Sequence, residues 1–91
     1  MPDDMPTSAF VWYHADQTCK ADLRAWMQHV QQALAIQGRL YQRQQDEKTT
    51  FMEVFECVGF ATIKKIEQLA AQQPCFHGIT RRCESFERIT P

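Results

Sequence analysis

The residues from Thr50 to Val58, TFMEVFECV, carry the clearest secondary-structure pattern in the chain. Phe and Val recur through the run after Thr50, and it contains neither Gly nor Pro, which is typical of a β-strand. Gly59 ends the run. A second pattern then begins, in which apolar residues recur at helical spacing until Pro74: Phe60, Ile63, Ile66, Leu69 and Ala70. The second half of the chain is therefore predicted to contain a strand followed by an amphipathic helix.

A strand and a helix are also predicted in the first half of the chain. Residues 9–14 (AFVWYH) are apolar on both faces, which is typical of a central strand covered on both sides. Asp16 and Thr18 are suitable N-caps for the helix that follows, and Gly38 is placed as its C-terminal stop. The helix itself is predicted from a second apolar stripe: Leu23, Trp26, Met27, Val30, Ala33 and Leu34.

Two further strands complete the pattern. Residues 39–43 (RLYQR) are expected to pair antiparallel with 50–58, through a polar hairpin loop at 44–49. Residues 75–79 are predicted to be a loop, and residues 81–89 to form the last strand. The order β-α-β-β-α-β predicts an α+β, ferredoxin-like fold, with a four-stranded antiparallel sheet and both helices on one face. Residues 1–8 are expected to form a flexible leader, and 9–91 a single domain.

A sheet with both helices on one face leaves a second face uncovered. In the strand 50–58, the period of two separates Met52, Val54 and Val58, which are assigned to the helix side, from Phe51, Glu53, Phe55 and Cys57, which are assigned to the second face. In the strand 39–43, Leu40 is assigned inward, and the second face receives Arg39, Tyr41 and Arg43. For the first and last strands, the sequence does not decide which residues face the helices. A face of this mixed composition needs a cover, which is another subunit, a ligand or both.

Composition excludes several classes of protein. The chain has 91 residues and a formal net charge of −1, so it favours neither nucleic acid nor another polyanion as a partner. No apolar run approaches the length of about 20 residues that a membrane span needs. The first residues carry acids and no positive region, which is untypical of a signal peptide, so we expect a cytoplasmic protein. In that compartment, free thiols are expected at Cys19, Cys57, Cys75 and Cys83.

Three segments carry a resemblance to known proteins: residues 51–56 (FMEVFE), residues 10–13 (FVWY) and residues 84–88 (ESFER). Together they resemble a family of short bacterial proteins of unknown function. More distantly, the acid and aromatic at Glu53 and Phe55 are similar to a strand motif of the dimeric α+β barrel group that includes the antibiotic-biosynthesis monooxygenases. This resemblance implies ferredoxin-like subunits that pair sheet to sheet, each enclosing a pocket. The histidine that these monooxygenases often carry on the next helix is absent from residues 63–66 (IKKI).

Glu53 and His14 are the candidate catalytic residues. Glu53 lies between Phe51 and Phe55 in the alternation, and a carboxyl group in such a partly apolar environment suits a general base. The alternative, which we favour, is an ion pair with Arg39 or Arg43 across the hairpin, or a contact with a second subunit. His14 ends the first strand, where an imidazole suits proton transfer near neutral pH or is simply exposed.

The remaining motifs carry less chemistry. The spacing Cys75-Phe-His77 differs from that of zinc sites, so no metal is expected, and His29 is expected at the surface. The three glycines of the chain form no nucleotide-binding loop, and no cofactor is expected. Aromatic residues on the second face raise RNA binding as a distant third possibility. The basic residue and glycine that precede the aromatics of RNA-recognition strands are missing here.

These observations predict a homodimer with facing sheets that binds a small molecule on the second face. Enzyme activity without a cofactor is left open. The expected ligand is polar and aromatic or acidic, and the residues predicted to bind it are Arg39, Tyr41, Phe51 and Phe55. The alternative is a non-catalytic structural or regulatory module, in which the same face binds only protein.

Overall fold

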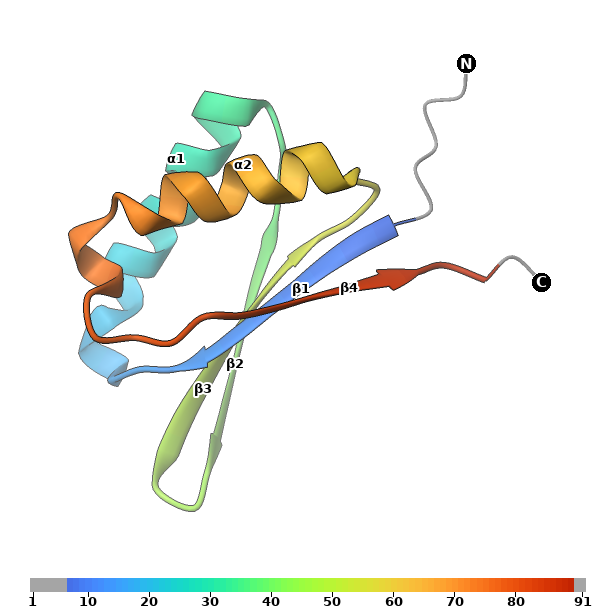
Figure 1. Cartoon of the computed structure of the whole chain (residues 1–91). Coiled ribbons are helices and arrows are strands. Elements are labelled where there is room, and N and C mark those ends of the chain that lie inside the picture. Colours follow the sequence, from blue (N-terminus) through green and yellow to red (C-terminus); the bar gives the residue numbers. More distant parts are fainter. Residues whose placement is uncertain (1–6, 90–91) are drawn as a thin grey trace.

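The computed structural model describes residues 7–89, and it confirms the predicted order of strands and helices (Figure 1). Residues 1–6 of the expected leader lie outside the described residues, and β1 begins at Thr7. Two single-turn 3₁₀ helices, Gln17–Cys19 and Pro74–Phe76, accompany the main elements. The main elements are β1 (Thr7–His14), α1 (Lys20–Leu34), β2 (Arg39–Gln45), β3 (Lys48–Phe55), α2 (Phe60–Ala71) and β4 (Arg82–Glu87).

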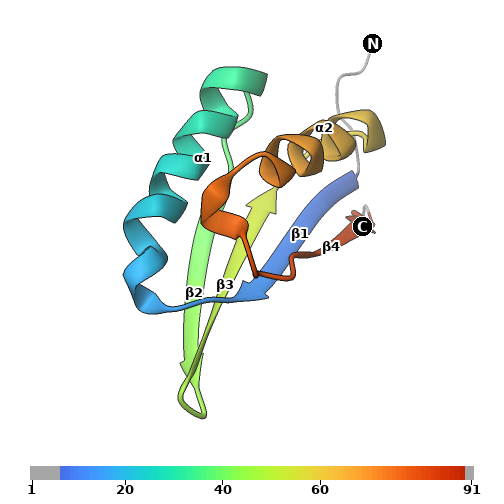
Figure 2. The same cartoon turned by 60° about the vertical axis from the view of Figure 1, so that its left-hand side comes forward.

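The four strands form one antiparallel sheet in the order β2-β3-β1-β4. Both helices pack on the same face of this sheet, and the other face carries no element of the described chain (Figure 2). The predicted ferredoxin-like α+β fold is therefore confirmed. Two layers account for all of the regular structure, which leaves one face of the sheet open.

Helix α1 buries one side and ends differently from the prediction. Asp16 accepts a hydrogen bond from the Thr18 backbone N–H at 2.9 Å and so caps the 3₁₀ turn Gln17–Cys19 that leads into α1. The N-cap of α1 itself is Cys19, not Asp16 or Thr18 as predicted. At the other end Ala35 takes the left-handed conformation, with φ of 58°, and ends the helix three residues before Gly38. The residues that α1 buries are Leu23, Trp26 and Val30.

Gly38 instead provides space for the core. A Cβ atom added there would lie 2.5 Å from Cε1 of Phe55 and 2.6 Å from Cε of Met27. Phe55 is fully buried, so its ring has little freedom to move away. The chain needs a residue without a side chain here so that it can pass over Phe55 into β2.

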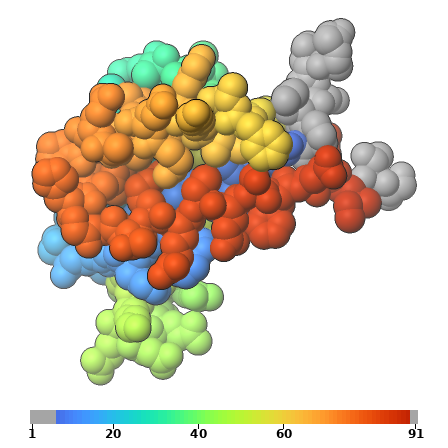
Figure 3. All heavy atoms as spheres, viewed as in Figure 1, coloured from blue at the N-terminus to red at the C-terminus, as the bar shows by residue number. Residues whose placement is uncertain are grey.

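The hairpin between β2 and β3 is tighter than the predicted loop at 44–49. Asp46 and Glu47 form a two-residue turn with φ of 54° and 61°, the conformation that suits the twist of paired strands. Strand pairing continues to Gln45 and Lys48 on either side of it. The end of this hairpin projects from the body of the domain (Figure 3).

Strand β3 faces the opposite way from the prediction. Phe51, Glu53 and Phe55 are buried beneath the helices, whereas Met52 and Val54 are only half-buried and face the open side. The predicted facing of β2 is correct, because Leu40 packs against the core and its neighbour Tyr41 is exposed. Cys57 lies beyond the end of β3, exposed, with φ of 58°. Val58 is buried, as predicted.

The physical reason for this error is the charge of Glu53. Both sides of β3 carry apolar residues. Because acids are rarely buried, the side that holds Glu53 is expected to face away from the helices. That rule fails when the charge has a partner inside the protein. Arg81 provides this partner, and the aromatic side of β3 becomes the core.

Candidate functional site

The uncovered side of the sheet is the first candidate site. On β1, Ala9, Val11 and Tyr13 are buried under the helices, so the alternate residues project to the other side. The strand register extends this surface across all four strands. We call it the open face, and it consists of Phe10, Trp12, His14, Arg39, Tyr41, Arg43, Thr50, Met52, Val54, Arg82, Glu84 and Phe86.

Large apolar side chains extend across the open face from one edge strand to the other. The rings of Phe10 and Phe86 pack edge to face with centroids 5.4 Å apart. Phe86 is nevertheless 55% exposed, and Tyr41, at the other edge of the sheet, is 52% exposed. Contiguous apolar surface of this kind marks a binding site or an interface in a folded protein.

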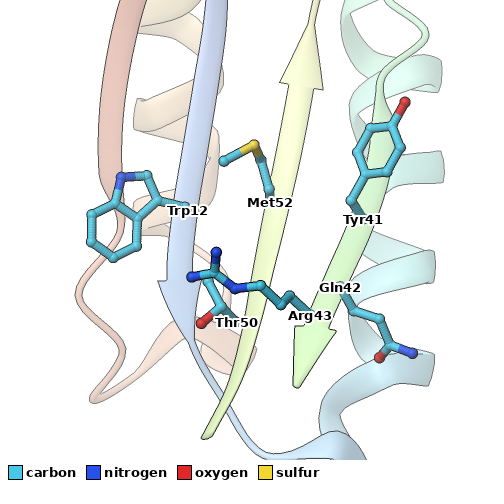
Figure 4. Close-up of a pocket in the computed structure, with 6 residues that line it drawn as sticks. All are labelled: Trp12, Tyr41, Gln42, Arg43, Thr50 and Met52. Carbon is cyan, nitrogen blue, oxygen red and sulfur yellow. The ribbon is translucent and has the colours of Figure 1, made fainter. Parts of the chain in front are cut away.

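Two adjoining hollows indent the open face, and they share Trp12 and Met52. The first has a volume of about 360 Å³ and is lined by residues of β1, β2 and β3: Trp12, Tyr41, Gln42, Arg43, Thr50 and Met52. Figure 4 shows Trp12 and Tyr41 on either side of Met52, with Gln42 pointing away from the other residues. The second hollow, of about 410 Å³, lies over Phe10, Trp12, Met52, Glu84 and Phe86. Both volumes are in the range of small-molecule pockets, about 300–1,000 Å³.

Polar groups surround Trp12 at one end of this face. The guanidinium carbon of Arg82 lies 5.1 Å from the centre of the Trp12 ring, a cation–π distance. His14 packs edge to face on Trp12, with centroids 5.8 Å apart. The Nδ1 atom of His14 and the hydroxyl of Thr50 are within hydrogen-bond distance, at 3.0 Å. An aromatic ring is thus placed between cationic and titratable groups.

A second cluster of polar residues is buried between the sheet and the helices. Both guanidinium NH₂ groups of Arg81 donate to the Glu53 carboxylate, at 2.7 Å and 3.1 Å, in a bidentate ion pair. Arg81 also donates to Glu67 of α2 at 2.8 Å, and the Tyr13 hydroxyl donates to Glu53 at 2.5 Å. Glu53 is fully buried and the Arg81 side chain is 8% exposed. Both charges are paired, as a buried ion pair requires.

Aromatic rings enclose the arginine of this cluster. The guanidinium carbon of Arg81 lies 4.5 Å from the centre of the Phe76 ring and 5.5 Å from those of Tyr13 and Trp26. These rings exclude water and favour the cation by cation–π attraction. Arg81 therefore connects β3, β1, α1, α2 and the 3₁₀ turn at 74–76 in one packed unit.

The environment of the cluster shifts two pKa values. Burial raises the pKa of Tyr13 well above its ordinary value, and the Glu53 charge and the hydrogen bond to it act in the same direction. Burial by itself lowers the pKa of Arg81, but hydrogen bonds to Glu67 and Glu53 and their charges outweigh it, so the pKa is raised. Both groups therefore stay protonated at neutral pH.

The structure separates the site residues predicted from the sequence. Tyr41 and His14 are on the open face, and Arg39 is also there, 3.7 Å from Glu56 in an exposed ion pair. The predicted placement of Phe51, Phe55 and Glu53 on this face is wrong, because all three are in the core. The ion-pair interpretation of Glu53 is correct in kind, but its partner is Arg81, not Arg39 or Arg43.

Three residues were not predicted from the sequence as part of a site: Trp12 and Met52 of the open face, and Arg81 of the buried cluster. Trp12 and Met52 alternate with buried neighbours, a pattern that became informative only once the facing of β1 and β3 was known. Arg81 cannot be recognised from the sequence, since nothing in its local sequence indicates an acidic partner on β3.

Three other findings concern the described part of the chain. Within residues 7–89, no group of three or more His, Cys, Asp and Glu side chains could hold a metal ion. The four cysteines are free. None of the helices among these residues is long and apolar enough to cross a membrane.

No family model matches the chain. No curated protein matches it either. Solved structures with a similar fold include the de novo designed protein Foldit4, at a TM-score of 0.68 and 6% identity over 91% of this chain and 98% of that chain. The C-terminal domain of MgtC from Mycobacterium tuberculosis has a TM-score of 0.62 and 14% identity, over 96% and 95% of the two chains.

A putative antibiotic biosynthesis monooxygenase from Deinococcus radiodurans is also similar, with a TM-score of 0.57 and 11% identity over 93% of this chain and 94% of that chain. The expected distant similarity to this group therefore holds for the fold. At such low identities the likeness shows the fold alone. A designed protein and differently named natural proteins share it, so the function has to be argued from the site.

The buried ion pair predicts a large effect of removing its cation. Arg81→Met should lower the free energy of unfolding by about 3–5 kcal/mol, because the Glu53 carboxylate stays buried without its partner. The double variant Arg81→Met/Glu53→Gln should be less destabilised than the sum of the two single variants, as measured by urea denaturation. Arg88→Met, at an exposed arginine, is the control and should change stability by less than about 0.5 kcal/mol. Additive losses in the double variant would show that the pair is not coupled.

The raised pKa of Tyr13 predicts a loss of stability at alkaline pH. Below about pH 10, Tyr13 is protonated in both the folded and the unfolded chain, so its contribution to stability is complete. Above that pH, the unfolded chain releases the proton while the folded chain keeps it, and the free energy of unfolding falls. Tyr13→Phe should therefore lose less stability than the parent between about pH 9 and about pH 11, as measured by urea denaturation. Equal alkaline losses in the parent and Tyr13→Phe would contradict this assignment.

Proposed function

We propose that this chain binds a small, flat, largely apolar molecule on the open face, and that a second copy of the chain covers the face around it. The observation that carries this proposal is the pair of adjoining hollows over Trp12 and Met52. Their floor is apolar, and aromatic side chains stand beside it: Phe10, Tyr41 and Phe86.

The energetics of the open face support a cover. Apolar surface left in water costs about 25 cal/mol per Å², and several large side chains contribute to it here. Both helices already pack on the other side of the sheet, so the described residues provide nothing more to cover this side. A second copy offers a surface of the same composition, as expected of a two-fold interface.

The size of the hollows supports a ligand between the two copies. Side chains of a partner that filled both hollows would leave no pocket, which is the expectation for a module that binds only protein. Each hollow is large enough for an aromatic molecule. The fold is also compatible with a small-molecule site, since one similar structure is described as a putative antibiotic biosynthesis monooxygenase.

The two candidate catalytic residues now differ in their relation to this site. Glu53 is fully buried on the other side of the sheet, where its carboxylate is held by Arg81. A ligand on the open face has no route to it without opening the core. His14 is exposed beside Trp12 and is the candidate that a bound ligand could contact. The proposal is therefore ligand binding, with His14 as the group from which any proton transfer would start.

The open face predicts both self-association and ligand binding. Light scattering should give a molar mass of two chains for the parent. Trp12→Ala should weaken self-association at least about tenfold, since a central aromatic side chain is lost. Phe60→Ala is the matched control, because Phe60 is an aromatic residue that is 71% exposed on α2, away from the open face.

Ligand binding is tested on the same variants with 2-naphthamide, a flat neutral probe. Its addition should shift the amide NMR signals of Trp12 and Met52 in the parent and in Phe60→Ala, and Trp12→Ala should bind it more weakly. A monomeric parent in which the probe shifts no signal of the open face would contradict the proposal. Saturable binding of an unstructured oligonucleotide at physiological salt would favour the RNA alternative instead.

A further inference from the structure

We infer that the molecule bound on the open face is an aromatic carboxylate, with its ring over Met52 between Trp12 and Tyr41 and its carboxylate on Arg43. This inference rests on the proposed function and adds the chemical class of the ligand. It follows from the shape of the first hollow and from the charges around it.

The first hollow is shaped for a flat ring. Trp12 of β1 and Tyr41 of β2 stand on opposite sides, and Met52 lies between them (Figure 4). The register confirms that the three residues form one row across the sheet, since Met52 pairs with Tyr41 on one side and with Trp12 on the other. A thioether between two aromatic side chains is an adaptable apolar surface for an aromatic ligand.

Arg43 places a cation at one end of that row. Its side chain crosses over β3 and ends beside Thr50, on the side of Trp12 (Figure 4). Within residues 7–89, no carboxylate lies within 4.0 Å of its guanidinium group. By contrast, Arg39 has Glu56 as a partner, and Arg81 has two carboxylates. The cation that borders the hollow is therefore free to bind an anion.

Covering the face makes this anion necessary. A guanidinium group that is taken out of water without a partner loses several kcal/mol of hydration, and a carboxylate restores most of it through bidentate hydrogen bonds. If a second copy covers Arg43, the copy or the ligand must supply the negative charge. The Arg82 guanidinium, 5.1 Å over the Trp12 ring, makes the potential at this end still more positive.

The carboxylate that lines a hollow of the open face lies in the second hollow. Glu84 pairs with Phe10 in the register and lines the second hollow beside Phe86. The Glu84 carboxylate repels an anion from the second hollow, so this hollow suits the apolar part of a ligand. The face therefore orients its ligand, with the carboxylate toward Arg43 and Thr50 and any apolar extension toward Phe10 and Phe86.

The test compares 2-naphthoate with its neutral isostere, 2-naphthamide, by calorimetry on the full chain. The carboxylate should bind at least about tenfold more tightly than the amide to the parent, because a bidentate ion pair with Arg43 replaces a hydrogen bond from the guanidinium to a neutral amide oxygen. Arg43→Gln should remove this preference, so that the variant binds 2-naphthoate and 2-naphthamide with similar affinity. Arg39→Gln is the matched control, because Arg39 lies on the same strand and face but is paired with Glu56, and it should keep the preference.

The outcomes separate the two proposals. Equal affinity for the two probes in the parent would overturn the inference that the ligand is a carboxylate bound by Arg43. An undiminished preference in Arg43→Gln would overturn it as well. Either result leaves the proposed binding face in place. If neither probe binds, or if the shifted amide signals lie on the helices, the binding face itself is wrong. Arg43 is exposed near the end of β2, so the thermal unfolding of Arg43→Gln should match that of the parent and confirm a folded variant.

Discussion

The buried ion pair between Glu53 and Arg81 determines which side of the sheet faces the helices. Once Arg81 holds the carboxylate, the two phenylalanines that alternate with it must also face inward, because the side-chain period of a strand is two. Met52 is thereby turned outward to join Trp12 on the open face. A single charged contact in the core thus sets the composition of the surface on the opposite side of the sheet.

Much of the fold follows from local pattern. The helical stripes and the existence of β3 are predictable because their periods differ and because Gly59 separates β3 from α2, although β3 ends at Phe55 and not at Val58. The facing of β3 is not predictable in this way, since both of its sides are apolar and Arg81 is distant in the sequence. The end of α1 is a smaller example, because Gly38 is explained by the ring of Phe55, a contact between separate elements.

The candidate site is predictable only in outline. The uncovered face, its need for a cover and the presence of Tyr41 follow from the strand order and the alternation of β2. Trp12 and Met52 are recognised only when the pairing of β1 with β3 is known. That no carboxylate of the described residues pairs with Arg43 is recognised only when the ion pairs of the fold are known. Burial of Glu53 moves the expected chemistry from a carboxylate base to a binding surface bordered by arginine and histidine.

The central claim is that two copies enclose a ligand site between their open faces. A crystal structure grown with 2-naphthoate tests it most directly. We expect two facing sheets with the naphthalene ring over Met52, beside Trp12, and its carboxylate on Arg43. Sheets that face solvent, or hollows filled entirely by side chains of the partner, would contradict the claim.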